Sequence, residues 1–179
     1  MKIVTLRRQR PSGSDMDDSS DPDGLADVLY YSSDYSDGSQ ALNKIFAESD
    51  YVVCAAPLTP NTFHMIGKEQ FSCMKQDGVF INVGRGPIVD EQAMIDALSL
   101  PIKERRLKGI ALDVFETEPL PDSSPLWKMK PSQVLLSPHN MDQTDTFMHE
   151  ATEFFLTENL PRFVRNLPVL NKVNPAEGY

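Results

Sequence analysis

Three kinds of side chain that can act on a carboxylate substrate occur at separate points of the sequence. Arg85 stands between two glycines, Glu118 lies in a proline-rich loop, and His139 directly follows a proline. A guanidinium binds a carboxylate through two parallel hydrogen bonds, which fixes the plane of the carboxylate. An imidazole beside a carboxylate favours its protonated form and can exchange a proton near neutral pH. Together these groups predict chemistry on a 2-hydroxy or 2-oxo acid, with a hydride carrier that side chains cannot supply.

Short apolar segments alternate with helical patterns along the chain, and these elements must position the three side chains. Strands are predicted over residues 2–6, 51–55, 79–83, 110–114 and 134–136. Helices are predicted over residues 39–48, 68–74 and 90–100. Asp90 is expected to cap the third of these helices. A longer helix is predicted to carry Phe147, Ala151, Phe154, Phe155 and Leu160, with a kink at Pro161.

The predicted strands are apolar throughout rather than alternating, which is typical of a parallel sheet covered on both faces. Ligands of such sheets bind outside the carboxyl ends of the strands. The informative positions are therefore the residues that follow each strand. These are Arg7, Pro57, the Gly84-Arg85-Gly86 turn, Asp113 and the Pro138-His139 pair.

The charge of the chain is concentrated in one segment. The 179 residues carry a formal charge of −9, from 17 basic and 26 acidic residues. Eight of the aspartates lie in residues 11–43, which contain no lysine or arginine, so the remainder has 17 basic and 18 acidic residues, or −1. Residues 11–38 are rich in Ser, Asp and Gly and are predicted to form a solvated acidic insertion, with a small ordered island around residues 25–31.

Several functional classes are disfavoured by composition. The acidic balance argues against a nucleic-acid binder and against a polybasic membrane binder. The two cysteines form no disulfide framework, no residues have metal-ligand spacing, and no apolar run is long enough to cross a membrane. We expect a cytoplasmic protein without a metal site.

Five motifs in a fixed order closely resemble the D-isomer-specific 2-hydroxyacid dehydrogenase family. They are AAPLTPNT at residues 55–62, NVGRGPIVDEQAMIDAL at 82–98, ALDVFETEPLP at 111–121, PLW at 125–127 and LLSPHN at 135–140. The ending LPVLNKVNPAEGY also resembles the segment that returns to the substrate domain in this family. The resemblance implies an NAD(P)-dependent oxidoreductase that reduces a 2-oxo acid to a D-2-hydroxy acid, similar to hydroxypyruvate or glyoxylate reductases or to phosphoglycerate dehydrogenase.

The resemblance also implies a role for particular residues. Arg85 is expected to bind the substrate carboxylate, His139 to be the general acid/base, and Glu118 to orient His139 and keep it protonated. Asp113 is expected to contact the nicotinamide carboxamide. The remaining residues implied in cofactor binding are Pro57, Thr62, Val83 and Gly84. Arg7 follows the first predicted strand, where an arginine suits a 2′-phosphate, so NADP is favoured over NAD.

The chain departs from the family pattern at its start. The family has a first strand and a G-x-G-x-x-G turn before the position of residues 2–6, and neither occurs in this sequence. We therefore expect an incomplete Rossmann-type, doubly wound parallel sheet. Residues 1–143 are expected to form a partial NAD(P)-binding domain, and residues 144–179 a C-terminal helix and return segment. Apolar surface is expected to be exposed where a first strand and a substrate domain pack in the family.

Two alternatives to an enzyme fragment remain open from the sequence. The first is a non-catalytic nucleotide-binding or dimerisation module, or an inactive truncated copy. The second is a flavodoxin-like single domain in which residues 2–6 are the true first strand. For a full-length protein, the resemblance implies a homodimer that acts on a small 2-oxo or 2-hydroxy acid.

Overall fold

The computed structural model describes residues 1–7, 24–35, 38–141 and 143–173. The strands are β1 (Val4–Arg7), β2 (Val28–Tyr31), β3 (Tyr51–Cys54), β4 (Gly78–Asn82), β5 (Leu107–Leu112) and β6 (Val134–Leu136). The helices are α1 (Gly38–Glu48), α2 (Lys68–Cys73), α3 (Glu91–Ser99), α4 (Phe147–Phe154) and α5 (Leu160–Val164). Short 3-10 helices occur at η1 (Ser32–Asp34), η2 (Gly86–Ile88) and η3 (Pro125–Lys128), and a π-helical segment at η4 (Phe155–Asn159). Every predicted strand and helix is present, with ends shifted by a few residues.

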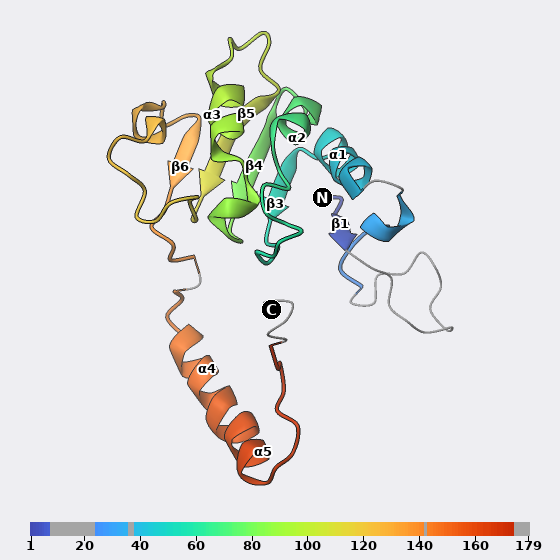
Figure 1. Cartoon of the computed structure of the whole chain (residues 1–179), viewed down its shortest axis with the longest axis vertical. Helices are drawn as coiled ribbons and strands as arrows, with labels where there is room; N and C mark the ends of the chain where they lie inside the picture. The colour runs from blue at the N-terminus through green and yellow to red at the C-terminus, as the bar shows by residue number, and fades with distance from the viewer. Residues whose placement is uncertain (8–23, 36–37, 142, 174–179) are drawn as a thin grey trace.

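All strands pair in parallel, in two sheets. Strands β3, β4, β5 and β6 form a four-stranded sheet in that order, and β1 pairs with β2 in a separate two-stranded sheet. Helices α1, α2 and α3 lie in a row over one face of the larger sheet (Figure 1). The rings of Phe46, Phe71 and Phe80 meet there, with centroids 5.4–6.2 Å apart. The α/β architecture with a parallel sheet is thereby confirmed.

Asp90 caps the start of α3, as predicted. Its carboxylate accepts a hydrogen bond from the Ala93 backbone N–H at 2.9 Å, which satisfies one of the free donors at the start of the helix. Met94, Ile95 and Leu98 are buried on the sheet side of α3. The helix therefore fixes the loop that precedes it, which carries Arg85.

The opposite face of the four-stranded sheet is open among the described residues. Val53, Ile81, Ala111 and Leu135 occupy one row across the four strands. Val53 and Leu135 expose 58% and 69% of their surface, and Tyr51 on the same face of β3 exposes 68%. Parallel sheets are normally buried on both faces, so this row is unusual apolar surface. It agrees with the expectation that exposed apolar surface accompanies an incomplete sheet.

Strand β2 gives a definite form to the ordered island that is expected around residues 25–31 of the acidic insertion. Residues 28–31 are ordered as a strand that pairs with β1 from Val4↔Val28 to Arg7↔Tyr31. The sequence VLYY explains this, since β-branched and aromatic residues favour strands and Tyr31 is buried. Residue 38, the expected end of the insertion, is the first residue of α1. Residues 11–23 lie outside the described part of the chain.

The C-terminal helix runs through α4, η4 and α5 without interruption, but the spacing of its backbone hydrogen bonds changes at η4. The Leu160 N–H bonds to the Phe155 carbonyl, a spacing of five residues, directly before Pro161. Proline has no N–H to donate within a helix, which explains why the helical ladder is disturbed at this point. The predicted kink is therefore a π-helical turn between α4 and α5.

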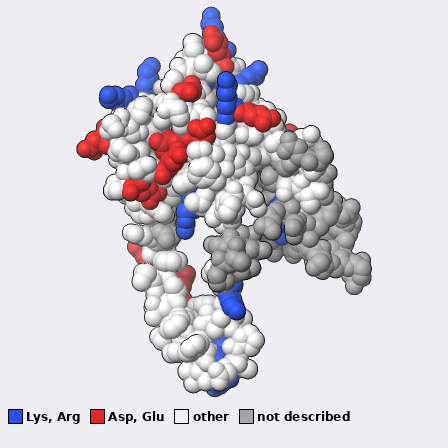
Figure 2. All heavy atoms as spheres, viewed as in Figure 1, with Lys and Arg blue, Asp and Glu red and all other residues white. Residues whose placement is uncertain are grey.

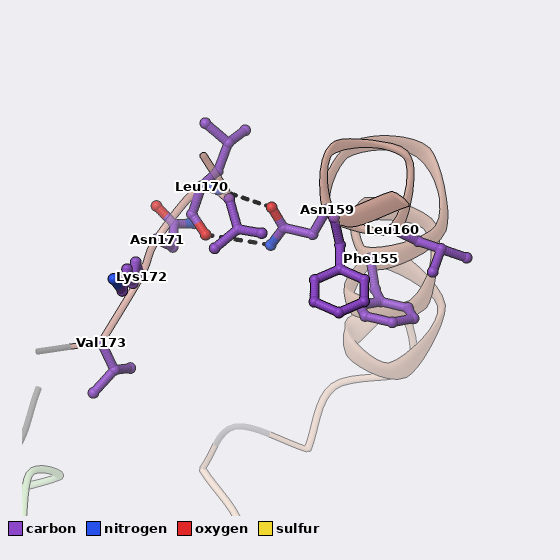
Figure 3. A pocket seen from close by; sticks show the side chains of 9 residues that line it. Phe155, Asn159, Leu160, Leu170, Asn171, Lys172 and Val173 are labelled. Carbon is purple, nitrogen blue, oxygen red and sulfur yellow. Dashed lines mark hydrogen bonds between the residues drawn. The ribbon is translucent and has the colours of Figure 1, made fainter. Parts of the chain in front are cut away.

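Beyond α5 the chain turns back and lies against the helix. The Asn159 side chain holds this return segment, because it accepts from the Leu170 N–H at 2.8 Å and donates to the Leu170 carbonyl at 3.2 Å (Figure 3). An apolar groove of about 550 Å³ lies between them, lined on the helix side by Phe155, Leu160 and Phe163. Figure 2 shows few charged side chains on this part of the surface. No helix in the described part of the chain is long and apolar enough to cross a membrane.

Candidate active site

The three side chains with predicted catalytic roles follow three neighbouring strands. Arg85 comes after β4, Glu118 after β5, and His139 after β6. Because the strands are parallel and adjacent in this order, their carboxyl ends lie at one edge of the sheet. The structure therefore places the three residues on neighbouring loops, as the sequence predicts.

Glu118 and His139 are in direct contact. The Nδ1 atom of His139 lies 2.8 Å from Oε2 of Glu118, and Oε1 of Glu118 accepts a hydrogen bond from the Phe115 N–H at 3.0 Å. Both carboxylate oxygens are thus engaged, which fixes the plane of the carboxylate. With Nδ1 directed at Glu118, the second ring nitrogen of His139, Nε2, has no hydrogen-bond partner among the described residues.

The charge of Glu118 is stabilised by its surroundings. Desolvation raises the pKa of Glu118, but the hydrogen bonds from His139 and Phe115 and the positive charges of His139 and Arg85 outweigh it. The pKa of Glu118 therefore lies below its ordinary value. An ionised Glu118 favours a proton on Nδ1 of the imidazole.

Asp113 holds the loop that carries His139. Its Oδ1 accepts from the Ser137 hydroxyl at 2.6 Å and from the Asn140 N–H at 3.0 Å, and its Oδ2 accepts from the Met141 N–H at 3.0 Å. Only 4% of Asp113 is exposed. His139 itself has a φ of +54°, a conformation that non-glycine residues rarely adopt. The three hydrogen bonds to Asp113 flank this residue on both sides and stabilise its backbone.

Replacing Asp113 by asparagine tests this anchor. The amide NH₂ cannot accept the hydrogen bonds that one carboxylate oxygen receives, so we expect a loss of about 1–3 kcal/mol of unfolding free energy at pH 7. Burial raises the pKa of Asp113, but the hydrogen bonds from Ser137, Met141 and Asn140 outweigh it, so the pKa lies below its ordinary value. Urea unfolding at neutral and acidic pH measures the effect.

The sign of the pH dependence follows from the lowered pKa. The stabilisation by Asp113 is present above the pKa of an unfolded aspartate and is lost as the pH falls through the folded pKa. The difference between the wild-type chain and Asp113→Asn is therefore expected to shrink in acid. Asp122→Asn, at an exposed position, is the matched control. A difference that is equal at both pH values contradicts the anchor.

The Arg85 loop is held by a buried asparagine and by glycines. Asn82, the last residue of β4, is 1% exposed; it accepts from the Gly84 N–H at 3.1 Å and donates to the Arg85 carbonyl at 3.2 Å. A Cβ at Gly84 would lie 2.7 Å from the Ala56 carbonyl oxygen, and one at Gly86 would overlap the Phe115 backbone. Glycine is required at both positions because three loops meet there.

The Arg85 side chain is exposed at this edge. One of its terminal nitrogens donates to the Gly84 carbonyl at 2.7 Å. The remaining donors of the guanidinium point to solvent or to a ligand, since no carboxylate within the described residues forms an ion pair with it. The arrangement is suited to binding an anionic group next to His139.

All but one of the residues predicted to bind the cofactor follow strands of the four-stranded sheet. Pro57 and Thr62 lie in one turn after β3, where the Thr62 hydroxyl donates to the Pro57 carbonyl at 2.8 Å. Val83 and Gly84 follow β4, and Arg7 is the last residue of β1. The structure brings Pro57 and Thr62 together, and Arg7 lies in the other sheet. Their roles toward a cofactor stay predictions.

Sequence reasoning missed three residues that shape this site. Asn82 and Ser137 support Arg85 and Asp113, and Glu116 binds His64 at 2.8 Å between two of the loops. Asn82 could have been found from the sequence, because it is a polar residue at the end of an apolar strand. The contact of His64 is with Glu116, a loop residue outside the predicted catalytic set.

Comparison with known proteins decides the family. Residues 25–140 match the NAD binding domain of the D-isomer specific 2-hydroxyacid dehydrogenases. The chain belongs to this family. Membership excludes the flavodoxin-like alternative and confirms the resemblance that the five motifs carry.

Relatives with curated names share much of the chain. It is 49% identical over 134 residues to glyoxylate/hydroxypyruvate reductase B of Serratia proteamaculans, which covers 75% of this chain and 39% of the relative. It is 40% identical over 133 residues to glyoxylate reductase of Korarchaeum cryptofilum, covering 74% of this chain and 38% of the relative. The chain therefore spans about two fifths of the length of these curated relatives.

Solved structures of the family superpose on the whole described fold. A D-isomer specific 2-hydroxyacid dehydrogenase from Xanthobacter autotrophicus, in complex with NADPH, matches 99% of this chain and 63% of its own, with 34% identity and a TM-score of 0.74. The NADPH-dependent glyoxylate/hydroxypyruvate reductase of Sinorhizobium meliloti, in complex with NADP, matches 99% of this chain and 49% of its own, with 25% identity and a TM-score of 0.73. The Rossmann-type fold of the family is thus shown for this chain.

Proposed function

We propose that this chain carries the catalytic side chains of an NAD(P)-dependent oxidoreductase that reduces a small 2-oxo acid to a D-2-hydroxy acid. The observation that carries the proposal is the 2.8 Å contact between His139, on the loop after β6, and Glu118, on the loop after β5, beside the loop after β4 that carries Arg85. The relatives named glyoxylate and hydroxypyruvate reductases support 2-oxo acids of this size as substrates.

In this proposal each of the three residues has one task. Arg85 binds the substrate carboxylate and fixes the orientation of the adjacent carbonyl. His139 donates the proton on Nε2 to the carbonyl oxygen, and in the reverse direction removes the proton of the hydroxyl group. Glu118 holds Nδ1–H, which orients the ring and stabilises the imidazolium before the proton leaves.

A nicotinamide cofactor supplies the hydride when it is bound. The chain offers groups that fit one: Asp113 Oδ1 accepts two hydrogen bonds and Oδ2 accepts one, so one acceptor position remains for an amide N–H. Pro57, Thr62, Val83 and Gly84 are proposed to line the cofactor along the strand ends. Arg7 at the end of β1 is proposed to favour the 2′-phosphate of NADP.

A chimera tests the proposed activity. In it, this chain replaces the matching part of the Serratia proteamaculans reductase, to which it is 49% identical. We expect the chimera to reduce glyoxylate with NADPH. The loss of NADPH absorbance measures the rate of this reaction. A folded chimera that binds NADPH without turning over glyoxylate or hydroxypyruvate supports the alternative of a non-catalytic module.

The cofactor preference is tested separately in the same chimera. Arg7→Glu is expected to weaken NADPH relative to NADH by at least about tenfold in kcat/KM, because a carboxylate repels the 2′-phosphate and accepts from a ribose hydroxyl. Lys2→Glu, a charge reversal five residues earlier, is the matched control. An unchanged ratio for Arg7→Glu contradicts its proposed role.

Sedimentation of the chimera tests the homodimer that belongs to this proposal.

A further inference from the structure

The connection between α3 and β5 carries a concentration of positive charge. Residues 100–108 contain four basic residues and one acidic residue, a formal charge of +3. Without them the chain has 13 basic and 25 acidic residues, or −12. The connection precedes β5, so it lies at the amino ends of the parallel strands, opposite the edge that carries the candidate active site. It projects at the top of Figure 1, and Figure 2 shows Lys and Arg side chains at this end of the molecule.

The connection is held in a fixed turn. The Pro101 carbonyl accepts a hydrogen bond from the Glu104 N–H at 2.8 Å. The Arg105 side chain donates to a carbonyl in the last turn of α3 at 3.3 Å, and the Gln76 side chain donates to the Ile102 carbonyl at 3.3 Å. These contacts tie the turn to α3 and to the segment between α2 and β4. A surface that is already ordered loses little conformational entropy when it binds a partner.

Three cations of the connection form no ion pair with another residue in the described ranges. They are Lys103, Arg106 and Lys108, and all three are exposed. The register between β4 and β5 skips Lys108, as in a β-bulge. A bulge leaves the extra residue out of the ladder and changes the direction of its side chain. An acidic partner can therefore supply the carboxylates that these cations lack.

A small pocket opens beside these cations, between α2, α3 and the connection. Its volume is about 260 Å³, and it is lined by Phe71, Ser72, Ala97, Leu100, Glu104 and Arg106. Phe71 is buried in the core, whereas Leu100 is exposed. An aliphatic side chain that enters the pocket contacts Phe71, Ala97 and Leu100, and it loses its contact with water there. The pocket thus adds an apolar contact to a positively charged surface.

We propose that residues 100–108 bind an acidic segment of a partner protein that carries one aliphatic side chain among its carboxylates. The carboxylates pair with Lys103, Arg106 and Lys108, and the aliphatic side chain enters the pocket beside Leu100. Exposed ion pairs contribute little free energy by themselves, so the apolar contact is needed for affinity. Ile102, which exposes 73% of its surface, adds an apolar contact at the tip of the turn. This interaction does not depend on the proposed reductase activity.

The distribution of charge favours a short acidic segment over an extended polyanion. At physiological salt an exposed charge acts over a Debye length of about 8 Å, so a short segment is influenced mainly by the +3 of residues 100–108. A nucleic acid or an anionic bilayer extends beyond the connection and meets the remainder of the chain, whose formal charge is −12. A bilayer surface also contacts only the projecting tip and leaves the pocket empty.

An NMR titration of the labelled 179-residue chain tests the docking site. The probe is a blocked peptide with the sequence Asp-Glu-Asp-Leu-Asp-Glu-Asp. One control peptide has serine in place of the leucine, and the other has Asn and Gln in place of the acidic residues. We expect the probe to shift the amide signals of residues 100–108 and Ser72 and to leave those of Glu118 and His139 unchanged. Each control peptide lacks one of the two contacts and is expected to bind at least about fivefold more weakly.

Charge reversals inside and outside the connection sharpen the test. Lys103→Glu is expected to raise the Kd of the probe at least about threefold, and Glu104→Lys, at the next residue, to lower it by a similar factor. Lys172→Glu changes the net charge as Lys103→Glu does, at an exposed lysine of the return segment, and is expected to leave the Kd unchanged. All three positions are exposed, so the variants are expected to fold. Unchanged amide signals of β4 and β5 verify this.

Four results overturn the proposal. The first is no shift of residues 100–108 at millimolar probe. The second is equal affinity for the serine control peptide, which shows that the pocket takes no part. The third is the same set of shifts with oligo(dT) or with vesicles of phosphatidylcholine and phosphatidylserine, which assigns the surface to a polyanion. The fourth is shifts that grow with chain concentration in the absence of the probe, which assigns the surface to the aspartate-rich segment of a second copy.

Discussion

Replacing His139 by alanine in the glyoxylate-reducing chimera is expected to lower kcat about 10²–10⁴-fold, the usual contribution of a positioned acid/base. The substrate KM is expected to change little, because the proposal assigns the contact with the substrate carboxylate to Arg85. In the proposed mechanism the proton comes from Nε2 of His139. Steady-state kinetics with saturating NADPH measures the effect.

The control for this variant is another histidine. His64→Ala removes an imidazole that contacts Glu116 rather than Glu118, so it leaves the proton donor intact. Its kcat is expected to stay within about tenfold of the parent, which is small beside the 10²–10⁴ range. A His139→Ala chimera that keeps full turnover shows that the proton comes from elsewhere.

Replacing Arg85 is expected to affect substrate binding most. Arg85→Met removes the charge and the paired donors, and we expect kcat/KM for glyoxylate to fall roughly 10²–10³-fold. Arg85→Lys keeps the charge but not the planar fork, so an intermediate loss is expected. The loss is expected mainly in KM for Arg85→Met, because the Asn82 and glycine contacts that shape the loop involve its backbone.

His139→Ala is expected to act mainly on kcat and Arg85→Met mainly on KM, so the two kinetic constants distinguish the proposed roles of these residues. A carboxylate-free 2-oxo compound, tested against the parent and against Arg85→Met, provides the second measurement. If Arg85 binds the carboxylate, the two proteins turn over this compound at similar low rates. An equal loss on glyoxylate and on the carboxylate-free compound contradicts the assignment.

The edge of the sheet that carries Arg85, Glu118 and His139 could be predicted from the sequence, because each of these residues is close in sequence to the strand that it follows. Arg85 and His139 each lie three residues after the end of an apolar strand and Glu118 six residues after one, and parallel strands bring their ends to one edge of the sheet. An ordered island at β2 could be predicted but its pairing as a strand could not, because its four apolar residues stand in an acidic, serine-rich segment. Its partner β1 lies more than twenty residues away, and only that pairing makes it a strand.

The task of Asp113 shows a second limit of the sequence. The family resemblance assigns this residue to a cofactor, whereas three of its four acceptor positions are used by Ser137, Asn140 and Met141. Those contacts depend on the left-handed backbone conformation of His139, and this conformation cannot be predicted from the residue type. Physical reasoning from the sequence thus places the carboxylate correctly and leaves its partners undetermined.

The position of this anchor has a mechanical consequence. His139 lies on the connection between β6 and the C-terminal helix, which projects from the sheet as a long arm (Figure 1). On that connection, between His139 and α4, the Met141 N–H is hydrogen-bonded to the carboxylate of Asp113, which follows the end of β5. Asp113 thus ties the backbone that follows His139 to the end of β5, so a displacement of the C-terminal helix is expected to leave the imidazole beside Glu118.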